Sequence, residues 1–216
     1  MELGDKPQVH KAMSNDTKYW DEFYKDCEDF EESNFSRVCH TLFPSDSIVE
    51  FGYGNGRDAK FFLDRGHTYL GIDSSVTAKE TVGGLKGRFH VADFTEIPYS
   101  IPCHDLVYSR FTLHSIPHRL ENRVIKNARL ILPVGGHFCL EARTVHDDLY
   151  GKGFPVKGEA RAFIDTHYRR FIVPKHLRRS LRRAGFKIIL DQEGTGLSIL
   201  GESDPHIIRL IAQKIK

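Results

Sequence analysis

Three glycines at alternate positions follow a glutamate in the segment VEFGYGNGRDAKFF. The glutamate is Glu50, and the glycines are Gly52, Gly54 and Gly56. Glycine serves where a backbone turns sharply or lets a ligand come close, so the segment is a candidate ligand-binding loop. A nicotinamide dinucleotide fingerprint needs glycine or alanine at the sixth position from Gly52, and that position holds Arg57. The spacing therefore favours a different nucleoside ligand.

Two carboxylates follow the next two apolar segments of the chain. Asp73 ends the segment TYLGID, and Asp93 is followed by Phe94 at the end of GRFHVADF. A carboxylate after the second strand of a nucleotide-binding sheet accepts hydrogen bonds from ribose hydroxyls. We expect Asp93 to accept the exocyclic amine of an adenine, with Phe94 covering the ring. The glycine loop and these acids together predict a nucleoside site.

A polar set in YSRFTLHSI follows the fourth apolar segment and is a candidate for the reacting side of the site. Its members are Ser109, Arg110, Thr112 and His114. An imidazole titrates near neutral pH, so His114 is the candidate general base, and a hydrogen-bonded structural histidine is the alternative. Arg110 and, after the fifth segment, Arg143 are candidates to hold a carboxylate or phosphate.

Four consecutive residues in DTHYRRFI extend this cationic set. They are His167, Tyr168, Arg169 and Arg170. Alternate side chains of an extended segment share a face, so His167 pairs with Arg169, and Tyr168 with Arg170. We expect one pair to face a substrate, since the planar guanidinium of arginine suits phosphate.

The elements that must position these residues alternate between strands and helices. Expected strands are 46–51, 68–73, 87–93, 104–111, 135–143, 186–192 and, at the end of the chain, 206–215, where a strand is preferred to a helix. Expected helices are 56–66, 117–132 and 174–185, with a further aromatic helical face at 17–26. This order predicts an α/β fold, doubly wound around a mostly parallel sheet. Ligands of such sheets bind at the carboxyl ends of the strands.

The same motifs, in this order, resemble those of class I S-adenosylmethionine-dependent methyltransferases. They are Glu50-x-Gly52-x-Gly54-x-Gly56, Asp73, Asp93-Phe94, HDLVYSRFTLHSI and LPVGGHF, and the resemblance covers roughly residues 46–141. It implies a seven-stranded Rossmann-like sheet, S-adenosyl-L-methionine as methyl donor and S-adenosyl-L-homocysteine as product. It also implies cofactor contacts from these motif residues and from Arg57, Ser74 and Ser109.

A narrower resemblance is to small bacterial methyltransferases found with capsule and surface-glycan genes. It rests on YWDEFY, GNGRD, YSRFTLHSI and HYRRFI. It implies that an N-terminal segment containing Tyr19 and Trp20 folds over the cofactor, and the alternative is that both are simple core aromatics. We therefore expect one domain over 1–216: a helical cap or lid at 1–45, a cofactor-binding core at 46–141, an irregular substrate-side insertion at 142–173, and a C-terminal helix and strands at 174–216.

Composition limits the remaining possibilities for this chain of 216 residues. There is no apolar run long enough for a bilayer and no apolar signal core, so a cytoplasmic protein is expected. The four cysteines are far apart and lack CxxC spacing, so neither disulfides nor a metal site is expected. The net charge of +2 is too small to indicate general nucleic-acid affinity, although residues 161–183 are rich in arginine. That arginine-rich stretch is either a solvated helix face or a polyanion-binding surface.

The resulting hypothesis is a methyltransferase that O-methylates a polar or anionic small molecule. Candidate acceptors are a sugar, a sugar phosphate or a phosphate-type group of a surface-glycan precursor. An RNA methyltransferase is the alternative among enzymes. The alternative of another class is a non-catalytic scaffold that keeps the fold and the cofactor.

Overall fold

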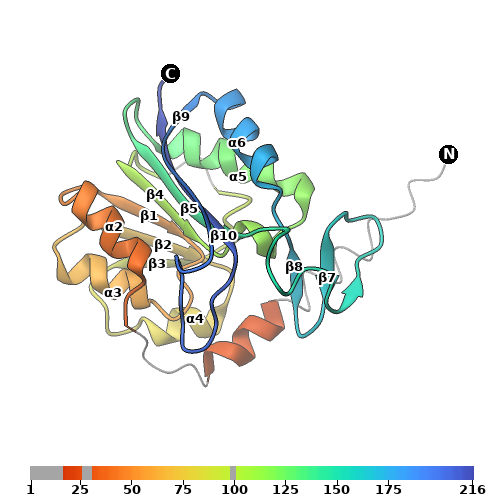
Figure 1. The fold of residues 1–216 in the computed structure, drawn as a ribbon. Coiled ribbons are helices and arrows are strands. Elements are labelled where there is room, and N and C mark those ends of the chain that lie inside the picture. Colours follow the sequence, from red (N-terminus) through yellow and green to blue (C-terminus); the bar gives the residue numbers. More distant parts are fainter. Residues whose placement is uncertain (1–16, 26–30, 98–100) are drawn as a thin grey trace.

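The computed structural model describes residues 17–25, 31–97 and 101–216. Its centre is a seven-stranded sheet in the order β3-β2-β1-β4-β5-β10-β9 (Figure 1). The strands are β1 (Ile48–Phe51), β2 (Tyr69–Asp73), β3 (Arg88–Val91), β4 (Leu106–Arg110), β5 (His137–Arg143), β9 (Phe186–Gly194) and β10 (Ile207–Lys214).

The pairing directions confirm the predicted mostly parallel, doubly wound sheet. The pairs β1–β2, β2–β3, β1–β4 and β4–β5 are parallel, whereas β10 is antiparallel to both β5 and β9. The chain ends in β10, so the preferred closing strand is confirmed. Strand order reverses between β1 and β4, which is where ligands bind in open α/β sheets.

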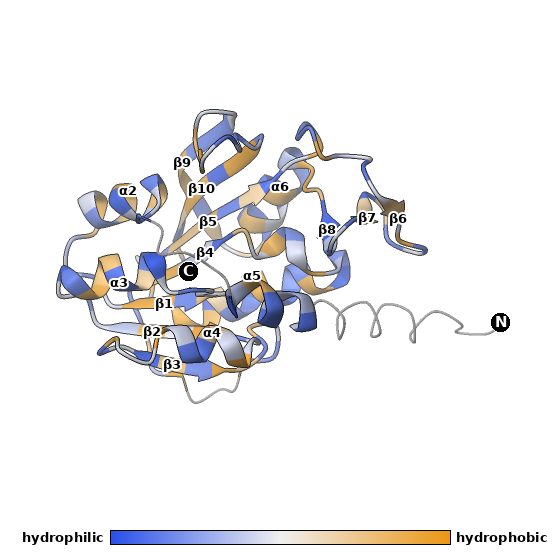
Figure 2. Ribbon diagram, turned by 90° about the horizontal axis from the view of Figure 1, so that it is seen from below, coloured by the Kyte–Doolittle hydropathy of each residue, from blue (hydrophilic) through white to orange (hydrophobic). Residues whose placement is uncertain are grey.

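Helices cover both faces of the sheet, because its strands are apolar on both sides. The helices are α2 (Asn34–Leu42), α3 (Arg57–Asp64), α4 (Val76–Thr81), η1 (Leu113–Ser115), α5 (His118–Ile131) and α6 (Pro174–Arg183). Val49 and Phe51 of β1 pack in the cluster that contains apolar residues of α5 and α6. Their neighbour Ile48 packs on the other side with residues of α2 and α3. Figure 2 shows hydrophobic residues concentrated on the central strands.

The insertion at 142–173 is more regular than predicted. It contains a small antiparallel sheet in the order β6-β7-β8, with β6 (Phe154–Pro155), β7 (Ala162–Ile164) and β8 (Tyr168–Arg170). The predicted irregular segment therefore contains three short strands that the sequence did not indicate. The three strands have only two or three residues each, too few for an alternating pattern to stand out among the glycines.

The N-terminal helix is held against the start of α4. Residues 17–25 are helical, and the carboxylate of Asp21 accepts hydrogen bonds from the hydroxyl of Ser75 and, at 3.3 Å, from the backbone N–H of Thr77. Of the predicted cap at 1–45, residues 1–16 and 26–30 lie outside the described residues. Among the helices that the structure describes, none has the length and apolar character required to span a membrane.

Candidate active site

The glycine loop runs from β1 into α3 in a conformation that requires glycine. Gly52 and Gly54 have φ angles of 73° and 57°, in the left-handed region that other residues rarely adopt. A Cβ on Gly52 would lie 2.4 Å from Cγ2 of Thr112, and one on Gly54 would lie 2.9 Å from the Tyr24 hydroxyl. The left-handed backbone therefore disfavours a larger residue at both positions, and close packing on Thr112 adds to this at Gly52.

Asp73 at the end of β2 fixes this loop from below. Its Oδ2 accepts the backbone N–H of Gly54 at 3.0 Å, and its Oδ1 accepts that of Ser75 at 2.9 Å. Each carboxylate oxygen keeps acceptor capacity for a second partner. Burial raises the pKa of Asp73, while the hydrogen bonds from Ser75 and Gly54 act in the opposite direction. The residue thus offers a buried acceptor pair at the carboxyl end of the sheet.

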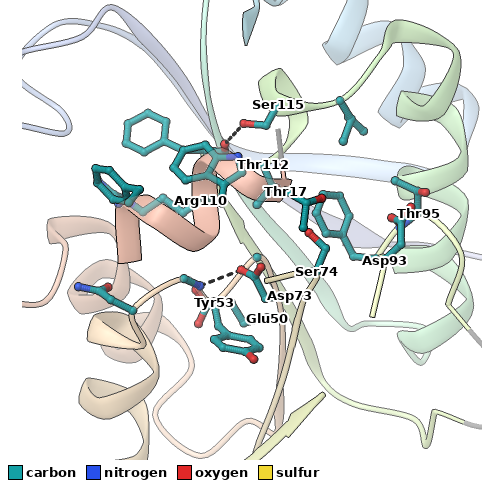
Figure 3. A pocket seen from close by; sticks show the side chains of 18 of the residues that line it. Thr17, Glu50, Tyr53, Asp73, Ser74, Asp93, Thr95, Arg110, Thr112 and Ser115 are labelled. Atoms are coloured by element: carbon teal, nitrogen blue, oxygen red, sulfur yellow. Dashed lines mark hydrogen bonds between the residues drawn. The ribbon is translucent and has the colours of Figure 1, made fainter. Parts of the chain in front are cut away.

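Glu50 lies beside the loop at the end of β1 and is also buried. It accepts a hydrogen bond from the hydroxyl of Tyr69. Burial raises the pKa of Glu50 well above its ordinary value, and the charge of Asp58 adds to that shift. Two buried carboxylates, Glu50 and Asp73, therefore line one end of the site (Figure 3).

Asp93 and Phe94 close the end of the site that follows β3. Oδ1 of Asp93 accepts the backbone N–H of Thr95 at 2.7 Å, which fixes the carboxylate. The ring of Phe94 stacks on that of Phe51, with centroids 5.8 Å apart. Phe94 lines the same cavity as Asp73, and so do Asp93 and Ser74, which are labelled in Figure 3. The structure therefore brings the predicted ribose and adenine residues together.

The cavity has a volume of about 740 Å³ and extends from the glycine loop to the ends of β4 and β5. Apart from the residues already described, its walls include residues of the N-terminal helix, of the end of η1, of α5 and of the loop that joins β9 to β10. These are Thr17, Trp20, Phe23, Tyr24, Ser115, Ile116, Arg119, Leu120, Arg123, Ser198, Leu200, Ser203 and Pro205.

The N-terminal helix lies against two different parts of the site. Trp20 lines the cavity, as predicted for a covering residue. Tyr19 is absent from the lining and stacks instead on His167, with ring centroids 4.5 Å apart. The helix therefore joins the cofactor side to the insertion. That it moves as a lid stays a prediction.

Arg57 begins α3 and presents a buried cation to the cavity. Its Nε is buried without a hydrogen-bond partner among the described residues, and the nearest carboxylate oxygen, in Asp58, is 3.8 Å away. Burial lowers the pKa of Arg57, and the neighbouring charge of Arg110 lowers it further. An unsatisfied buried donor beside a second cation favours an anionic group at this end of the cavity.

Arg110 and Arg143 form the cationic side of the cavity. Arg110 donates to Glu141 at 3.1 Å and to the hydroxyl of Ser198 at 2.7 Å, and Arg143 pairs with Asp147 at 2.8 Å. Both line the cavity, as predicted for substrate-binding residues. Their guanidinium groups are thus anchored by acids at the wall of the cavity.

Phe111, between these arginines in space, was not predicted from the sequence. Its φ of 59° is left-handed, which is unusual for a bulky residue and is typical of strained functional positions. The guanidinium carbons of Arg110 and Arg143 lie 4.4 and 5.7 Å from its ring centroid. No pattern of residue types predicts a left-handed backbone at this position. The loop containing Ser198 was also missed, because it precedes the last strand and carries no motif.

His114 is buried behind this rim and is absent from the cavity lining. Its Nδ1 accepts the backbone N–H of Arg143 at 3.2 Å, so the proton of the neutral ring is on Nε2. Burial lowers the pKa of His114 well below its ordinary value, and Arg143 and Arg169 lower it further. This arrangement favours the structural alternative over the predicted general base.

Ser109 was predicted to contact the cofactor, but its side chain is buried at the end of β4 outside the cavity lining. Its hydroxyl is bonded to that of Thr112, which does line the cavity. Ser109 therefore supports the wall of the site, and a direct contact stays a prediction.

The alternation predicted for residues 167–170 is present in β8 and in the residue that precedes it. His167 and Arg169 form one pair, with Nε2 of His167 accepting from Nη2 of Arg169 at 3.0 Å. Burial lowers the pKa of His167 to about 4, and the charges of Arg169 and Arg143 contribute. Neither His167 nor Arg169 lines the cavity, and both belong to the insertion, where the charge of Arg143 acts on them.

Arg170 is not available to a substrate, so its predicted role is wrong. The guanidinium pairs with Glu121 at 2.9 Å and donates to the carbonyls of Leu113 and Ile116. Arg170 is 2% exposed, and Tyr168 on the same face is 4% exposed and outside the cavity lining. This face of β8 packs inward on η1 and α5, so the predicted substrate contact of Tyr168 lacks support as well.

Comparison with known proteins places these features in a family. The sequence pattern that defines the methyltransferase domain matches residues 22–190, which is most of the chain. The chain belongs to the methyltransferase domain family. Because the methyl donor of the family is S-adenosylmethionine, the predicted activity and cofactor are confirmed. Among curated protein sequences, none matches this methyltransferase significantly.

Solved structures agree with the fold. The chain is similar to 1,6-didemethyltoxoflavin-N1-methyltransferase from Burkholderia thailandensis, with a TM-score of 0.74 and 16% identity over 100% of this chain and 93% of that one. That structure contains 1,6-didemethyltoxoflavin and S-adenosylhomocysteine. The chain is also similar to an S-adenosylmethionine-dependent methyltransferase from Methanosarcina mazei, with a TM-score of 0.72 and 20% identity over 83% of this chain and 97% of that one. For the CcbJ methyltransferase from Streptomyces caelestis, the TM-score is 0.71 and the identity 15%, over 93% of this chain and 99% of that one.

The residues of the cavity fit this methyl donor. The donor carries a carboxylate, for which Arg57 offers a buried donor without a hydrogen-bond partner in the described chain. It carries two ribose hydroxyls, for which Asp73 offers the remaining acceptor capacity of two fixed oxygens. Its adenine would lie by Asp93 and Phe94. When bound, the donor supplies an activated methyl group, so the protein mainly aligns the acceptor and excludes water.

Proposed function

We propose that this methyltransferase transfers the methyl group of S-adenosylmethionine to an oxygen of an anionic small molecule. The acceptor occupies the part of the cavity bounded by Arg110, Arg143 and Phe111. We further propose that a sugar phosphate or a related phosphate-bearing glycan precursor is the natural acceptor, because arginine forks match phosphate oxygens.

The observation that carries this proposal is an excess of half-buried positive charge on the insertion side of the cavity, where Arg143 lines the wall and Arg169 lies outside the lining. Arg169 forms no ion pair with any described residue, and burial and then the charge of Arg143 lower its pKa. The neighbouring histidines His114 and His167 stay neutral for the same reasons. Like charges held together in a partly dry site favour a bound anion, since the anion replaces repulsion with charge-assisted hydrogen bonds.

An anionic oxygen also removes the need for a general base. A phosphate or carboxylate oxygen carries its negative charge before the reaction, whereas a hydroxyl benefits from a proton acceptor. The buried Nδ1 of His114 already accepts the backbone N–H of Arg143, which suits the first case better than the second. The arginines hold the acceptor in line with the methyl group, and closure of the cavity excludes water.

The test compares the pH dependence of three proteins: the wild type, Arg169→Met and His114→Ala. With a sugar phosphate as acceptor, we expect a raised KM in Arg169→Met. The rate should be flat above about pH 7, and below it should change only through the second ionisation of the phosphate near pH 6, equally in all three proteins. His114→Ala should change the rate by less than about tenfold, well under the ~10²–10⁴ of a lost general base. A rate that rises through a histidine-like pKa and loses this rise in His114→Ala would show a hydroxyl acceptor instead.

A further inference from the structure

The solvent face of α5 carries a line of cations that begins at the active-site cavity. Arg119 and Arg123 line the cavity at the amino-terminal end of the helix. Lys126 and Arg129 follow at seven and ten positions after Arg119, on the same side of a helix with 3.6 residues per turn. The opposite side is apolar and buried, with Leu120, Val124, Ile125 and Ala128. The line spans roughly 15 Å at 1.5 Å per residue.

A second hollow continues this line between α5 and α6. Its volume is about 530 Å³, and it shares Lys126 and Arg129 with the line of cations. Its remaining polar and charged walls are Asn122, Ser180, Arg183 and Lys216. The hollow therefore has four basic residues and no acidic side chain among its described lining. We call the surface formed by this line of cations and the adjoining hollow the α5 track. Its basic residues are Arg119, Arg123, Lys126, Arg129, Arg183 and Lys216.

Nearby acidic residues neutralise only part of the positive charge of the α5 track. Glu121, the only acid in either helix, is buried and pairs with Arg170. Arg123 pairs with the exposed Glu96 at 3.2 Å, and Arg129 donates to the main-chain oxygen of Lys216. Lys126 and Arg183 are exposed and form no ion pair with any residue that the structure describes.

We propose that the α5 track binds an anionic carbohydrate chain whose terminal unit enters the cavity as the methyl acceptor. The inference rests on the proposed function for that terminal unit, and on the track alone for the chain. Cations at one-turn intervals bind successive anionic groups, and the amide of Asn122 and hydroxyl of Ser180 supply hydrogen bonds to neutral sugar hydroxyls. The enzyme would then act on a growing or finished oligosaccharide.

Two observations favour a carbohydrate over a nucleic acid. Proteins that bind single strands combine cations with aromatic platforms for the bases, and the hollow between α5 and α6 has no aromatic residue in its described lining. The net charge is only +2 and the isoelectric point about 8.3, which is low for a nucleic-acid-binding domain. A short anionic oligosaccharide needs only the local charge of the α5 track.

The test is direct binding measured by fluorescence anisotropy, without methyl donor. The probes are a labelled heparin hexasaccharide and a labelled single-stranded RNA of equal charge, each titrated at several salt concentrations. The test variant is Lys126→Glu/Arg183→Glu, and the matched control is Lys86→Glu/Lys152→Glu, which makes the same charge change at exposed residues outside α5 and α6. Unchanged S-adenosylhomocysteine binding and unchanged melting temperature verify that each variant is folded.

We expect the wild type to prefer the hexasaccharide, and the test variant to bind it at least about tenfold more weakly with a reduced salt dependence. The control should bind nearly as well as the wild type. No binding by the wild type, equal losses in both variants, or tighter binding of RNA would each overturn the proposal. Retained hexasaccharide binding without any transfer to anionic acceptors would instead contradict only the proposed function.

Discussion

Replacing Asp73 with asparagine tests the cofactor site at its most constrained point. In Asp73→Asn one oxygen becomes an NH₂ group, and the negative charge is lost. A hydrogen bond to a charged group contributes about 1.5–3 kcal/mol, and the variant loses this for at least one ribose hydroxyl. We therefore expect S-adenosylhomocysteine binding to weaken by about 2–3 kcal/mol, or roughly 30- to 150-fold in Kd.

The same substitution should also destabilise the protein. Oδ1 and Oδ2 both accept backbone N–H groups, so an amide nitrogen at either position faces a donor. Leaving one buried N–H unpaired costs about 1–3 kcal/mol of unfolding free energy. A loss of affinity must therefore be separated from partial unfolding, and isothermal calorimetry is to be performed below the melting temperature of each variant.

Asp105→Asn provides the matched control. Oδ2 of Asp105 accepts hydrogen bonds from the backbone N–H of Ser47 at 3.0 Å and from its hydroxyl at 2.7 Å. Asp105 immediately precedes β4, at the end of the sheet opposite the cavity. In this variant the asparagine carbonyl can still accept both hydrogen bonds but the charge is lost, so it should lose some stability without losing affinity for S-adenosylhomocysteine. Unchanged affinity in Asp73→Asn, or an equal loss in both variants, would refute the assignment of Asp73 to the ribose.

Three further predictions follow from single contacts. Trp20 is the only tryptophan and lines the cavity, so its emission should change on titration with S-adenosylhomocysteine; constant emission and constant quencher access would contradict a covering role. Arg170→Met leaves buried Glu121 with only the exposed ring of His118, 3.7 Å away, as an ionic partner, and should lower the unfolding free energy in urea by about 3–5 kcal/mol. Arg169→Met should cost less than about 1 kcal/mol, and similar losses in the two variants would refute the assignment of Arg170 to the core. The pKa of His167 is lowered from 6.5 to about 4, so in the folded protein this residue stays neutral at pH values where it takes up a proton in the unfolded chain. The free energy of unfolding should therefore fall by up to about 3 kcal/mol as pH falls from 6.5 to 4. An identical pH dependence in His167→Gln would contradict this.

The cofactor half of the site was predictable because residue type and position agree. Glycines that must adopt left-handed φ angles, and carboxylates such as Asp73 at strand ends, leave a direct mark on the sequence. The central sheet was predictable for a similar reason, since its strands are short apolar segments separated by helices. Even the uncertain last segment is a strand, paired with both β5 and β9.

The acceptor half was less predictable because it depends on which face of a segment is buried. The alternation at 167–170 predicted which side chains share a face of the strand but not which face is buried. Arg170 proved to be on the buried face. The left-handed backbone of Phe111 is imposed by its surroundings and leaves no pattern. One α6 arginine, Arg178, is neutralised by Asp191 and Glu193, which are distant in sequence but adjacent in space.

The most direct test of the central claim is methyl transfer from isotopically labelled S-adenosylmethionine to paired acceptors. Each pair contains a sugar phosphate and the corresponding neutral sugar, and products are identified by mass spectrometry. We predict labelled product from the phosphate member only, strongly reduced in Arg143→Met/Arg169→Met while S-adenosylhomocysteine binding is retained. Label in the neutral sugars alone, or undiminished transfer by the double variant, would contradict the account.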